Sequence, residues 1–232
     1  MLPGLAAVPR RAPGVDPGEV LDGSDPATEW RGFHDPAGAE LARAIDRLAR
    51  WDRVADTASV ETTWFTLMVE RRMAGRSDPP SWVAALADAL RLLREEWGTT
   101  EVTWGQLNRH QRPLPGDPAR ALDPDRPSLP VGGASGGFGS VFSYYSAPVD
   151  GPAGPRIGLA GNSFVKVVEF GPTPTARSVL NYGLSGDPAS RHFFDQAELY
   201  VRRAFKPAWF TRAEVEANAV RSYGVGATAG ER

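Results

Sequence analysis

Residues 182–196 read Tyr-Gly-Leu-Ser-Gly-Asp-Pro-Ala-Ser-Arg-His-Phe-Phe-Asp-Gln. The glycines, the aspartate and the proline predict a turn, because these residues either tolerate unusual backbone angles or fix them. The strand-like run Arg177–Tyr182 precedes this turn. The helix expected after it has apolar residues at helical spacing, which are Phe193, Ala197, Tyr200, Val201 and Phe205. The stretch is therefore expected to be a strand–turn–helix junction.

Three earlier helices are predicted between residues 35 and 98. The first starts at Asp35-Pro36, an N-cap residue followed by proline; the second follows Ser59 and ends before Gly75; the third lies between Ser81 and Gly98. Each has one apolar face. These faces consist of Leu41, Ile45, Leu48 and Trp51; of Val60, Trp64, Leu67 and Met68; and of Val83, Leu86, Leu90, Leu93 and Trp97. We expect the helices to pack together, with the tryptophans (Trp51, Trp64, Trp82, Trp97 and Trp104) in their core.

The second half of the chain predicts strands. Ser140–Ser146 is rich in aromatic and small residues, and Phe164–Phe170 is apolar on both faces, as in a strand that is covered on both sides. Phe164–Phe170 is expected to pair antiparallel with Arg177–Tyr182 across the turn 171–174. The strands between residues 160 and 183 should then present a large apolar face that needs cover.

The order of these elements predicts an α+β fold, with a helical unit, antiparallel strands and two closing helices. The second closing helix is expected after Thr211, which forms a capping box with Glu214. The expected division is an irregular lead-in (1–34), a helical segment (35–110), a proline- and aspartate-rich connection (111–130), a strand-rich segment with the C-terminal helices (131–224) and a tail (225–232).

Composition narrows the function classes. The 232 residues are 41% hydrophobic and 23% charged, as in an ordinary globular protein. The net charge of −2 gives no basic footprint for nucleic acid. The absence of cysteine excludes disulfides, thiolate metal sites and a cysteine nucleophile, and leaves the redox compartment open. No apolar run of about 18 residues could span a membrane, and the first residues do not resemble a signal peptide.

Residues 183–196 resemble the closing motif of the penicillin acylase family, Gly-x-Ser-Gly-x-Pro-x-Ser-x-His-(two residues)-Asp-Gln, and especially its acyl-homoserine lactone and aculeacin acylase branch. Four further stretches resemble the family in the same order. They are Leu48–Asp52 with Ser59 and Trp64-Phe65; Trp104–Arg109; Leu129–Gly133 running on to Gly139–Val141; and Gly161–Val168. Asn108 stands where histidine is common in the family, and Arg191 where proline is frequent. The resemblance covers most of this chain but only the last part of the family's β chain.

The resemblance implies the C-terminal portion of an αββα N-terminal-nucleophile hydrolase. In such enzymes a serine or threonine freed by autoproteolysis attacks an amide, with its own α-amino group as base. Backbone amides and an asparagine then hold the oxyanion. The family places these groups upstream of the matched region, so no catalytic, cofactor-binding or metal-binding residue is assigned in this chain. A structural calcium and a periplasmic or extracellular location are implied for the intact enzyme only, and its signal would lie outside this chain.

Ser185, His192 and Asp195 could be interpreted as a nucleophile, a base and an orienting carboxylate. Because His192 and Asp195 are three residues apart, the spacing favours a structural role, in which they hold the start of the helix against the preceding turn. Lys166 lies in an apolar strand, where an edge position, or an ion pair with Glu169 or a neighbouring segment, is favoured over a catalytic lysine.

Three other patterns favour structural roles. The glycine-rich run 132–139 lacks the Gly-Lys-Ser/Thr of a phosphate loop and is expected to be a turn into a strand. The histidines (His34, His110 and His192) are too scattered for a metal site. The acidic residues Asp117, Asp123 and Asp125 alternate with proline, lack the calcium-loop pattern and are expected in a solvated loop.

The expected function is that of the C-terminal portion of an N-acyl amidohydrolase, which acts on an acyl-homoserine lactone, a lipopeptide or a β-lactam side chain. Its partners would be the remaining, nucleophile-bearing part of the acylase and the small-molecule substrate. This chain alone should lack amidase activity. Two alternatives stay open: a split enzyme completed by a separately encoded chain, and a non-catalytic remnant that acts as a binding or structural module.

Overall fold

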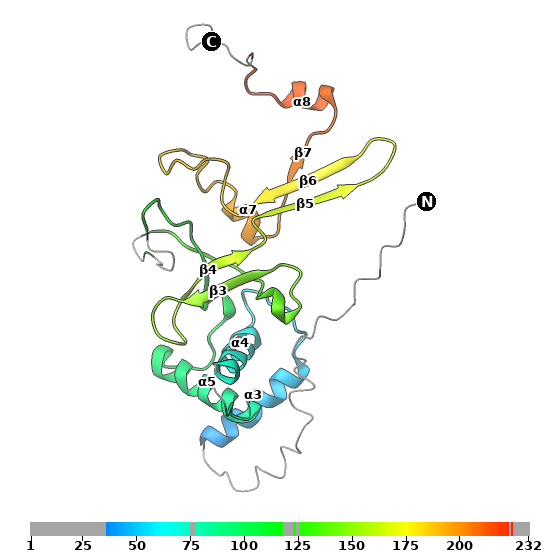
Figure 1. The fold of residues 1–232 in the computed structure, drawn as a ribbon. Helices are drawn as coiled ribbons and strands as arrows, with labels where there is room; N and C mark the ends of the chain where they lie inside the picture. The colour runs from blue at the N-terminus through cyan, green and yellow to red at the C-terminus, as the bar shows by residue number, and fades with distance from the viewer. Residues whose placement is uncertain (1–35, 75–77, 118–122, 124–125, 223, 225–232) are drawn as a thin grey trace.

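The computed structural model describes residues 36–74, 78–117, 123, 126–222 and 224. They form an α+β fold, as predicted, in which a helical unit is followed by two small sheets (Figure 1). The helices are α3 (Pro36–Arg50), α4 (Val60–Met73), α5 (Trp82–Trp97), α6 (Trp104–Leu107), η1 (Gly136–Phe138), α7 (Ala197–Val201) and α8 (Arg212–Asn218). The strands are β1 (Asn108–His110), β2 (Leu129–Pro130), β3 (Tyr144–Pro148), β4 (Arg156–Gly161), β5 (Phe164–Glu169), β6 (Thr175–Leu180) and β7 (Lys206–Ala208). The expected lead-in 1–34 and tail 225–232 lie outside the described residues.

The helices α3, α4 and α5 pack into one unit, as their apolar periodicity predicts. Ser59 and Ser81 cap α4 and α5 by accepting the backbone N–H groups of Thr62 and Ala84 at 3.0 and 3.1 Å. Gly98 ends α5 with a φ of 71°, a left-handed conformation that glycine adopts without strain. Large buried side chains of this core include Trp64, Phe65, Leu67, Met68, Leu86, Leu93, Trp104 and Leu107. The predicted helix boundaries at Asp35 and Gly75 lie outside the described residues.

The tryptophans anchor this core, as expected. Trp64 and Trp104 are buried, and their indole N–H groups donate to the backbone carbonyls of Thr100 and Gly133 at 2.7 and 2.8 Å. Trp97 donates to the carbonyl of Ala153 at 2.9 Å. The partly buried tryptophans that pack against the core are Trp51, Trp82 and Trp97. Trp64 and Trp104 therefore combine a large apolar contact with a satisfied donor.

The first sheet has the strand order β2-β1-β4-β3. Its centre is a parallel pair, in which Arg109 of β1 lies opposite Ile157 of β4, and the outer pairs are antiparallel. The segment predicted as helical through residue 110 therefore ends in a strand, because residues 108–110 find a backbone partner almost fifty residues away. The strand predicted at Ser140–Ser146 begins later, at Tyr144, and runs to Pro148.

The second sheet has the order β5-β6-β7 and is antiparallel throughout. The predicted hairpin is confirmed, with Phe164 opposite Leu180 at one end and Glu169 opposite Thr175 at the other. Figure 1 shows this hairpin extending away from the body of the molecule. Within this chain β5 lacks cover on both faces, since Phe164, Val167 and Val168 are 56%, 57% and 37% exposed. The expected apolar surface in need of cover is present.

The closing helices differ from the prediction in one respect. The helix expected from Phe193 to Phe205 is limited to α7, because turns precede it and Arg203 adopts a φ of 55°, which is incompatible with a right-handed helix. The chain then forms β7 instead of continuing as a helix. The helix α8 begins with the expected capping box of Thr211 and Glu214, and none of its residues is buried. None of the described helices has the length and apolar composition that a membrane crossing requires.

Two sets of contacts join the parts. Arg156 of β4, which is 1% exposed, donates to the partly exposed Glu70 carboxylate of α4 and to Ser146 of β3, so an ion pair with a buried guanidinium joins the first sheet to the helical unit. The second set is an apolar cluster between the two sheets. Its buried members are Val131, Tyr144, Val179 and Tyr200. The two sheets thus share a small hydrophobic core that is separate from the core of the helical unit.

Candidate functional site

The closing motif 182–196 is held in place by Arg112, which follows β1. Its guanidinium donates from Nη1 to the backbone carbonyls of Ser185, at 2.7 Å, and of Phe193. The same group lies 4.1 Å from the centre of the Phe193 ring and 5.2 Å from that of Tyr182. One cation therefore binds both sides of the turn through hydrogen bonds and aromatic contacts. The motif also closes on itself, since the Gln196 N–H donates to the Tyr182 carbonyl at 2.8 Å.

Gly183 is the tightest point of this turn. A Cβ atom at this position would lie 2.2 Å from the His192 carbonyl oxygen and 2.7 Å from the Asp195 carboxylate. Such distances are far below van der Waals contact, so only glycine fits without movement of the backbone. Gly186, three residues later, has open space around the same position.

Ser185, His192 and Asp195 lie in the same turn but do not form a nucleophile–base pair. His192 Nδ1 is 2.7 Å from the Asp195 carboxylate, while Nε2 accepts from Arg191 Nε at 3.0 Å. The Ser185 hydroxyl accepts the Asp187 N–H at 3.1 Å, and the Ser185 N–H donates to the His192 carbonyl. Because Arg191 occupies the basic nitrogen of His192, that nitrogen cannot accept a proton from Ser185. The helix begins at Ala197, so these residues stabilise the turn before it and not the helix start.

His110, at the end of β1, is the centre of an aromatic cluster that the sequence patterns did not reveal. It is 1% exposed. Its ring stacks on Tyr182 with centroids 5.1 Å apart and planes 14° apart, and its centroid is also 5.1 Å from that of Tyr200. Phe194 and Tyr144 complete the enclosure at 5.6 and 5.8 Å. The residues around His110 come from β3, from the end of β6, from the closing motif and from α7, so this imidazole joins the two sheets.

Both ring nitrogens of His110 have partners. Nε2 lies 2.7 Å from the Asn181 carbonyl and must donate to it, since a carbonyl only accepts. In the neutral ring Nδ1 then accepts from the Tyr144 hydroxyl at 3.1 Å. That hydroxyl is also 3.0 Å from the Arg109 carbonyl, so its single proton serves two acceptors. Burial lowers the pKa of His110 from 6.5 to about 4, although the bond to Asn181 opposes this shift. His110 is therefore neutral at pH 7, with its lone pair engaged.

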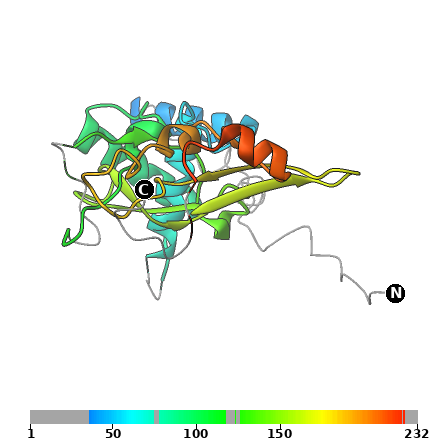
Figure 2. The same ribbon diagram turned by 90° about the horizontal axis from the view of Figure 1, so that it is seen from above.

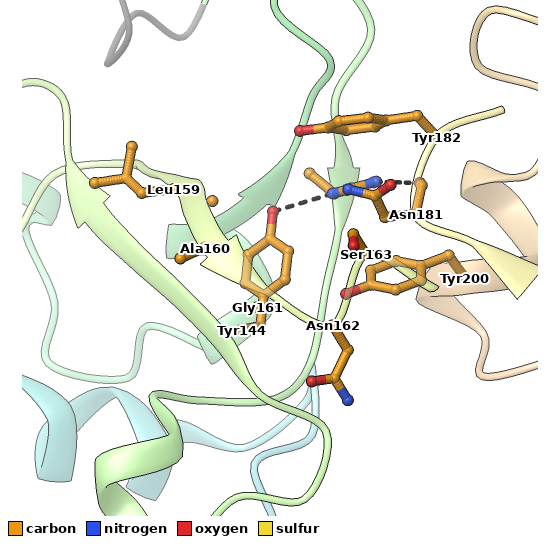
Figure 3. Close-up of a pocket in the computed structure, with 11 residues that line it drawn as sticks. Tyr144, Leu159, Ala160, Gly161, Asn162, Ser163, Asn181, Tyr182 and Tyr200 are labelled. Carbon is orange, nitrogen blue, oxygen red and sulfur yellow. Dashed lines mark hydrogen bonds between the residues drawn. The ribbon is translucent and has the colours of Figure 1, made fainter. Parts of the chain in front are cut away.

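A cavity of about 240 Å³ adjoins His110 (Figure 3). Figure 3 shows Tyr182 and Tyr200 on opposite sides of it, with their hydroxyl groups directed to the same side as Tyr144. Burial raises the pKa of the hydroxyls of Tyr144, Tyr182 and Tyr200, so all three stay protonated at neutral pH. The lining residues are His110, Tyr144, Gly158, Leu159, Ala160, Gly161, Asn162, Ser163, Asn181, Tyr182 and Tyr200.

The glycine-rich run 132–139 takes no part in this cavity. It forms the single turn η1, capped by Ser135, and Gly133 has a φ of 87°. A Cβ atom on Gly133 would lie 2.5 Å from the Phe142 carbonyl, so the glycine allows two backbone segments to approach. The expected turn ahead of a strand is observed, as β3 follows it.

The acidic and basic residues considered from the sequence have structural positions. Asp117 and Asp123 both pair with Arg126, at 2.6 and 2.7 Å, so their loop is an ion-pair network and not merely solvated. Asp125 and His34 lie outside the described residues. Lys166 is exposed on β5, which is an edge strand of its sheet, so the expected edge position is confirmed. Among the described residues, no group of three or more histidine, aspartate or glutamate side chains is placed to hold a metal ion.

Asn108, which stands where the resemblance suggested histidine, is fully buried on β1. Its Nδ2 donates to the Val131 carbonyl at 2.8 Å, and this bond supports the pairing of β1 with the segment after β2. Its Oδ1 is without a hydrogen-bond partner among the described residues. The side chain therefore has a structural role between strands.

Comparison with known proteins places this sequence in a family. The penicillin amidase family model matches residues 35–217. The chain belongs to the penicillin amidase family. Aculeacin-A acylase of Actinoplanes utahensis is 33% identical over 91 residues, which cover 39% of this chain and 12% of that protein. Acyl-homoserine lactone acylase PvdQ of Pseudomonas fluorescens is 34% identical over 90 residues, 38% of this chain and 11% of PvdQ.

A third member of the penicillin amidase family extends the match. Acyl-homoserine lactone acylase PvdQ of Pseudomonas putida is 29% identical over 136 residues, which cover 58% of this chain and 15% of that protein. The matched stretches thus cover only 11% to 15% of the length of these relatives. The resemblance drawn from the closing motif and the four earlier stretches is confirmed at the level of the family, whose named relatives are acylases.

Proposed function

We propose that this chain is the C-terminal portion of an acylase-like amidohydrolase whose nucleophile is supplied by a part of the enzyme outside it. The intact enzyme would cleave the amide between an acyl chain and an amine, as in an acyl-homoserine lactone, a lipopeptide or a β-lactam side chain. Membership of the penicillin amidase family supports the reaction class. The small share of each relative that is matched supports the status of a portion.

The observation that carries this proposal is the exposure of β5. A strand with apolar residues on both faces is typical of the interior of a layered fold, where helices or a second sheet cover it. Here Val167 and Val168 point to opposite faces of the strand, and both are exposed. Phe170, just beyond the strand, is 87% exposed. A surface of this kind is typical of an interaction site, and it supports the remaining part of the acylase as the partner that covers β5.

The hydrogen bonds of the histidines support a scaffold role. In the described part of the chain, the side chains of His110 and His192 bond to tyrosine, aspartate, arginine or a backbone carbonyl, and neither bonds to a serine or threonine hydroxyl. A nucleophilic hydroxyl needs a base within hydrogen-bond reach. We therefore expect the nucleophile and its base to come from the upstream part, and the intact enzyme to be periplasmic or extracellular.

A complementation assay tests the proposal. Hydrolysis of a chromogenic acyl-anilide is measured for the chain alone, for the region encoded directly upstream alone, and for the two parts co-expressed. We expect turnover only from the two parts together. Turnover by the chain alone would refute the absence of a nucleophile. A failure of the two parts to associate would instead favour the non-catalytic module.

Matched variants show whether β5 forms the interface. Val167→Lys places a charge on the exposed hairpin and should abolish association with the upstream part, since an unpaired charge at a buried interface is costly. Val141→Lys is the control, because Val141 is 94% exposed and lies outside the second sheet. It should leave association and turnover unchanged. Equal losses in both variants would contradict a specific role for β5.

A further inference from the structure

The chain has two lysines, and the fold brings both onto one row of the second sheet. Of its 26 lysine and arginine residues, the other 24 are arginines. Lys166 of β5 and Lys206 of β7 both lie opposite Ser178 of the central strand β6. Residues that lie opposite each other in antiparallel strands point to the same face of the sheet. The α-carbons of the two lysines are therefore about 10 Å apart on one face, which is two strand spacings.

Apolar residues flank this lysine row on the same face. On one side of the row, Phe164 lies opposite Leu180. On the other side, Val168 lies opposite Ala176, which also pairs with Ala208. Phe164 and Val168 are among the exposed apolar residues of the hairpin. This face is thus an apolar surface with two positive charges in its middle.

Neither lysine has an acidic partner in the part of the chain that the structure describes. No ion pair or side-chain hydrogen bond involves Lys166 or Lys206 there. Glu169 lies three residues after Lys166 on the same strand and therefore points to the opposite face. The carboxylates of α7 and α8 have other partners, in the pairs Glu198–Arg202, Glu214–Thr211 and Glu216–Arg212.

Any structure that covers this face has to compensate the two positive charges. In the proposed function the upstream part of the acylase covers β5, and the present inference rests on that proposal. Burying an ammonium group without a counter-charge is costly, whereas a well-formed pair with a carboxylate is tolerated. Lysine suits such a contact, because its methylene stem packs on apolar neighbours while its ammonium group reaches a carboxylate.

We propose that the upstream part docks on this face with a segment that carries carboxylate side chains between apolar ones. The carboxylates pair with Lys166 and Lys206, and the apolar side chains pack on Phe164 and Val168. The lysine row fixes the position of this segment along the strands, because charge pairs set the register of an interface that apolar contacts alone would leave undefined.

Methionine variants of the lysines test the proposal. The full chain is immobilised and the region encoded directly upstream is titrated onto it. Lys166→Met and Lys206→Met each keep a long apolar side chain and remove the charge, so a carboxylate in the interface loses its partner. Each should weaken association at least about tenfold. Lys166→Arg should stay within about threefold of the original chain, since a guanidinium also pairs with carboxylates.

Arg43→Met is the control for loss of a positive charge. Arg43 is exposed on α3, outside the second sheet. Its replacement should leave association unchanged. If the two lysine-to-methionine variants bind the upstream region as well as the original chain or better, apolar contacts alone cover the face, and this inference is wrong while the proposed function stands. If the original chain does not bind the upstream region at all, both are wrong.

Two measurements without the upstream region test other occupants of the face. In sedimentation, Lys166→Met should self-associate at least as strongly as the original chain, because a lysine on an edge strand opposes pairing with other chains. Weaker self-association would assign the lysines to a contact with a second copy. Binding of the original chain to phosphatidylglycerol vesicles that both methionine variants lose would assign them to an anionic lipid surface. Either result would overturn the proposal.

Discussion

At the scale of single residues, His110 has the most consequential environment in the chain. Its neighbours Tyr144, Tyr182 and Tyr200 are neutral, and the positive charge of Arg112 lies on the far side of the stack. An imidazolium would therefore gain no opposite charge in this position. The folded protein keeps His110 neutral because burial lowers its pKa.

We expect the free energy of unfolding to fall as the pH drops below about 6.5. The unfolded chain protonates His110 near its ordinary pKa of 6.5, while the folded chain resists protonation until about pH 4. Protons thus favour the unfolded chain, and the stabilisation present above pH 6.5 is lost on the way to pH 4. The loss should reach about 2 kcal/mol at pH 5, since a tenfold change in proton affinity corresponds to about 1.36 kcal/mol. Urea unfolding at pH 8 and pH 5 measures it.

His110→Gln should be less stable at pH 8, because the stacking is lost, but should lack most of this decrease between pH 8 and pH 5. His192→Gln, which removes an exposed histidine, should keep the full decrease. An unchanged slope in His110→Gln would show that other groups cause the pH dependence.

At the scale of elements, the closing motif is a turn fixed by backbone contacts. Arg112 binds the carbonyls of Ser185 and Phe193, and Gly183 provides the space in which the turn folds back on His192. These contacts depend on the path of the backbone more than on the side chains of Ser185 or His192. The motif therefore identifies the family by a shape and not by reacting groups.

Gly183→Ala should destabilise the chain by about 2 kcal/mol, because the added methyl group overlaps the His192 carbonyl and the backbone must move. Gly186→Ala adds the same methyl group to the same turn in open space, and should change stability by no more than about 0.5 kcal/mol. Urea unfolding of both variants gives the comparison. Similar effects in the two would mean that the tight approach at Gly183 does not determine stability.

The sequence predicted elements well where the signals are local. Ser59, Ser81, Thr211 and Gly98 fixed helix ends correctly, since a cap acts within one turn of its own residue. The hairpin β5–β6 followed from its apolar runs and the turn between them. The strands β1, β2 and β7 were missed because they are only two or three residues long. The six-residue strand β4 was missed because its sequence, Arg-Ile-Gly-Leu-Ala-Gly, contains two glycines and only one β-branched residue. The helix around Tyr200 was overextended, since aromatic periodicity does not reveal the break at Arg203.

At the scale of the whole molecule, the second sheet and α8 extend from the body and carry much of the exposed apolar surface (Figures 1 and 2). Large exposed residues there include Phe164, Val167, Phe170, Trp209 and Phe210. The edge strand β5 also has one side without a strand partner among the described residues. Such an edge pairs readily with another chain.

We expect the isolated chain to self-associate through this hairpin at roughly micromolar to millimolar concentrations. The double variant Val167→Thr, Phe170→Ser should shift sedimentation towards the monomer without loss of stability, since both side chains are exposed. Val165→Thr is the comparison, because Val165 packs against the cluster between the sheets and should cost stability instead. A monomeric original chain would contradict the expectation.

The aromatic cluster around His110 could not be predicted from the sequence. Ser185, His192 and Asp195 attracted attention because they are neighbours in the sequence. The cluster that the fold builds joins His110 to Tyr144, Tyr182 and Tyr200, which lie 34 to 90 positions further along the chain. No local pattern connects these residues. The sequence does place aromatic residues on both sides of the closing turn, Tyr182 and Phe193. Aromatic residues at such positions indicate a hydrophobic core and do not predict a cavity.

The residues that bury His110 lie far from it in the sequence, and this separation has a consequence during protein synthesis. Ribosomes add about 5 to 20 residues per second, so Tyr200 is added roughly 5 to 20 seconds after His110. The helical unit lies before His110 and can fold in this interval, because its contacts are local. During this interval the helices α3, α4 and α5 can already be packed together, while the His110 side chain is still exposed to solvent and can be protonated. The burial of His110 is complete only when the segment that carries Tyr182, Phe194 and Tyr200 has been made.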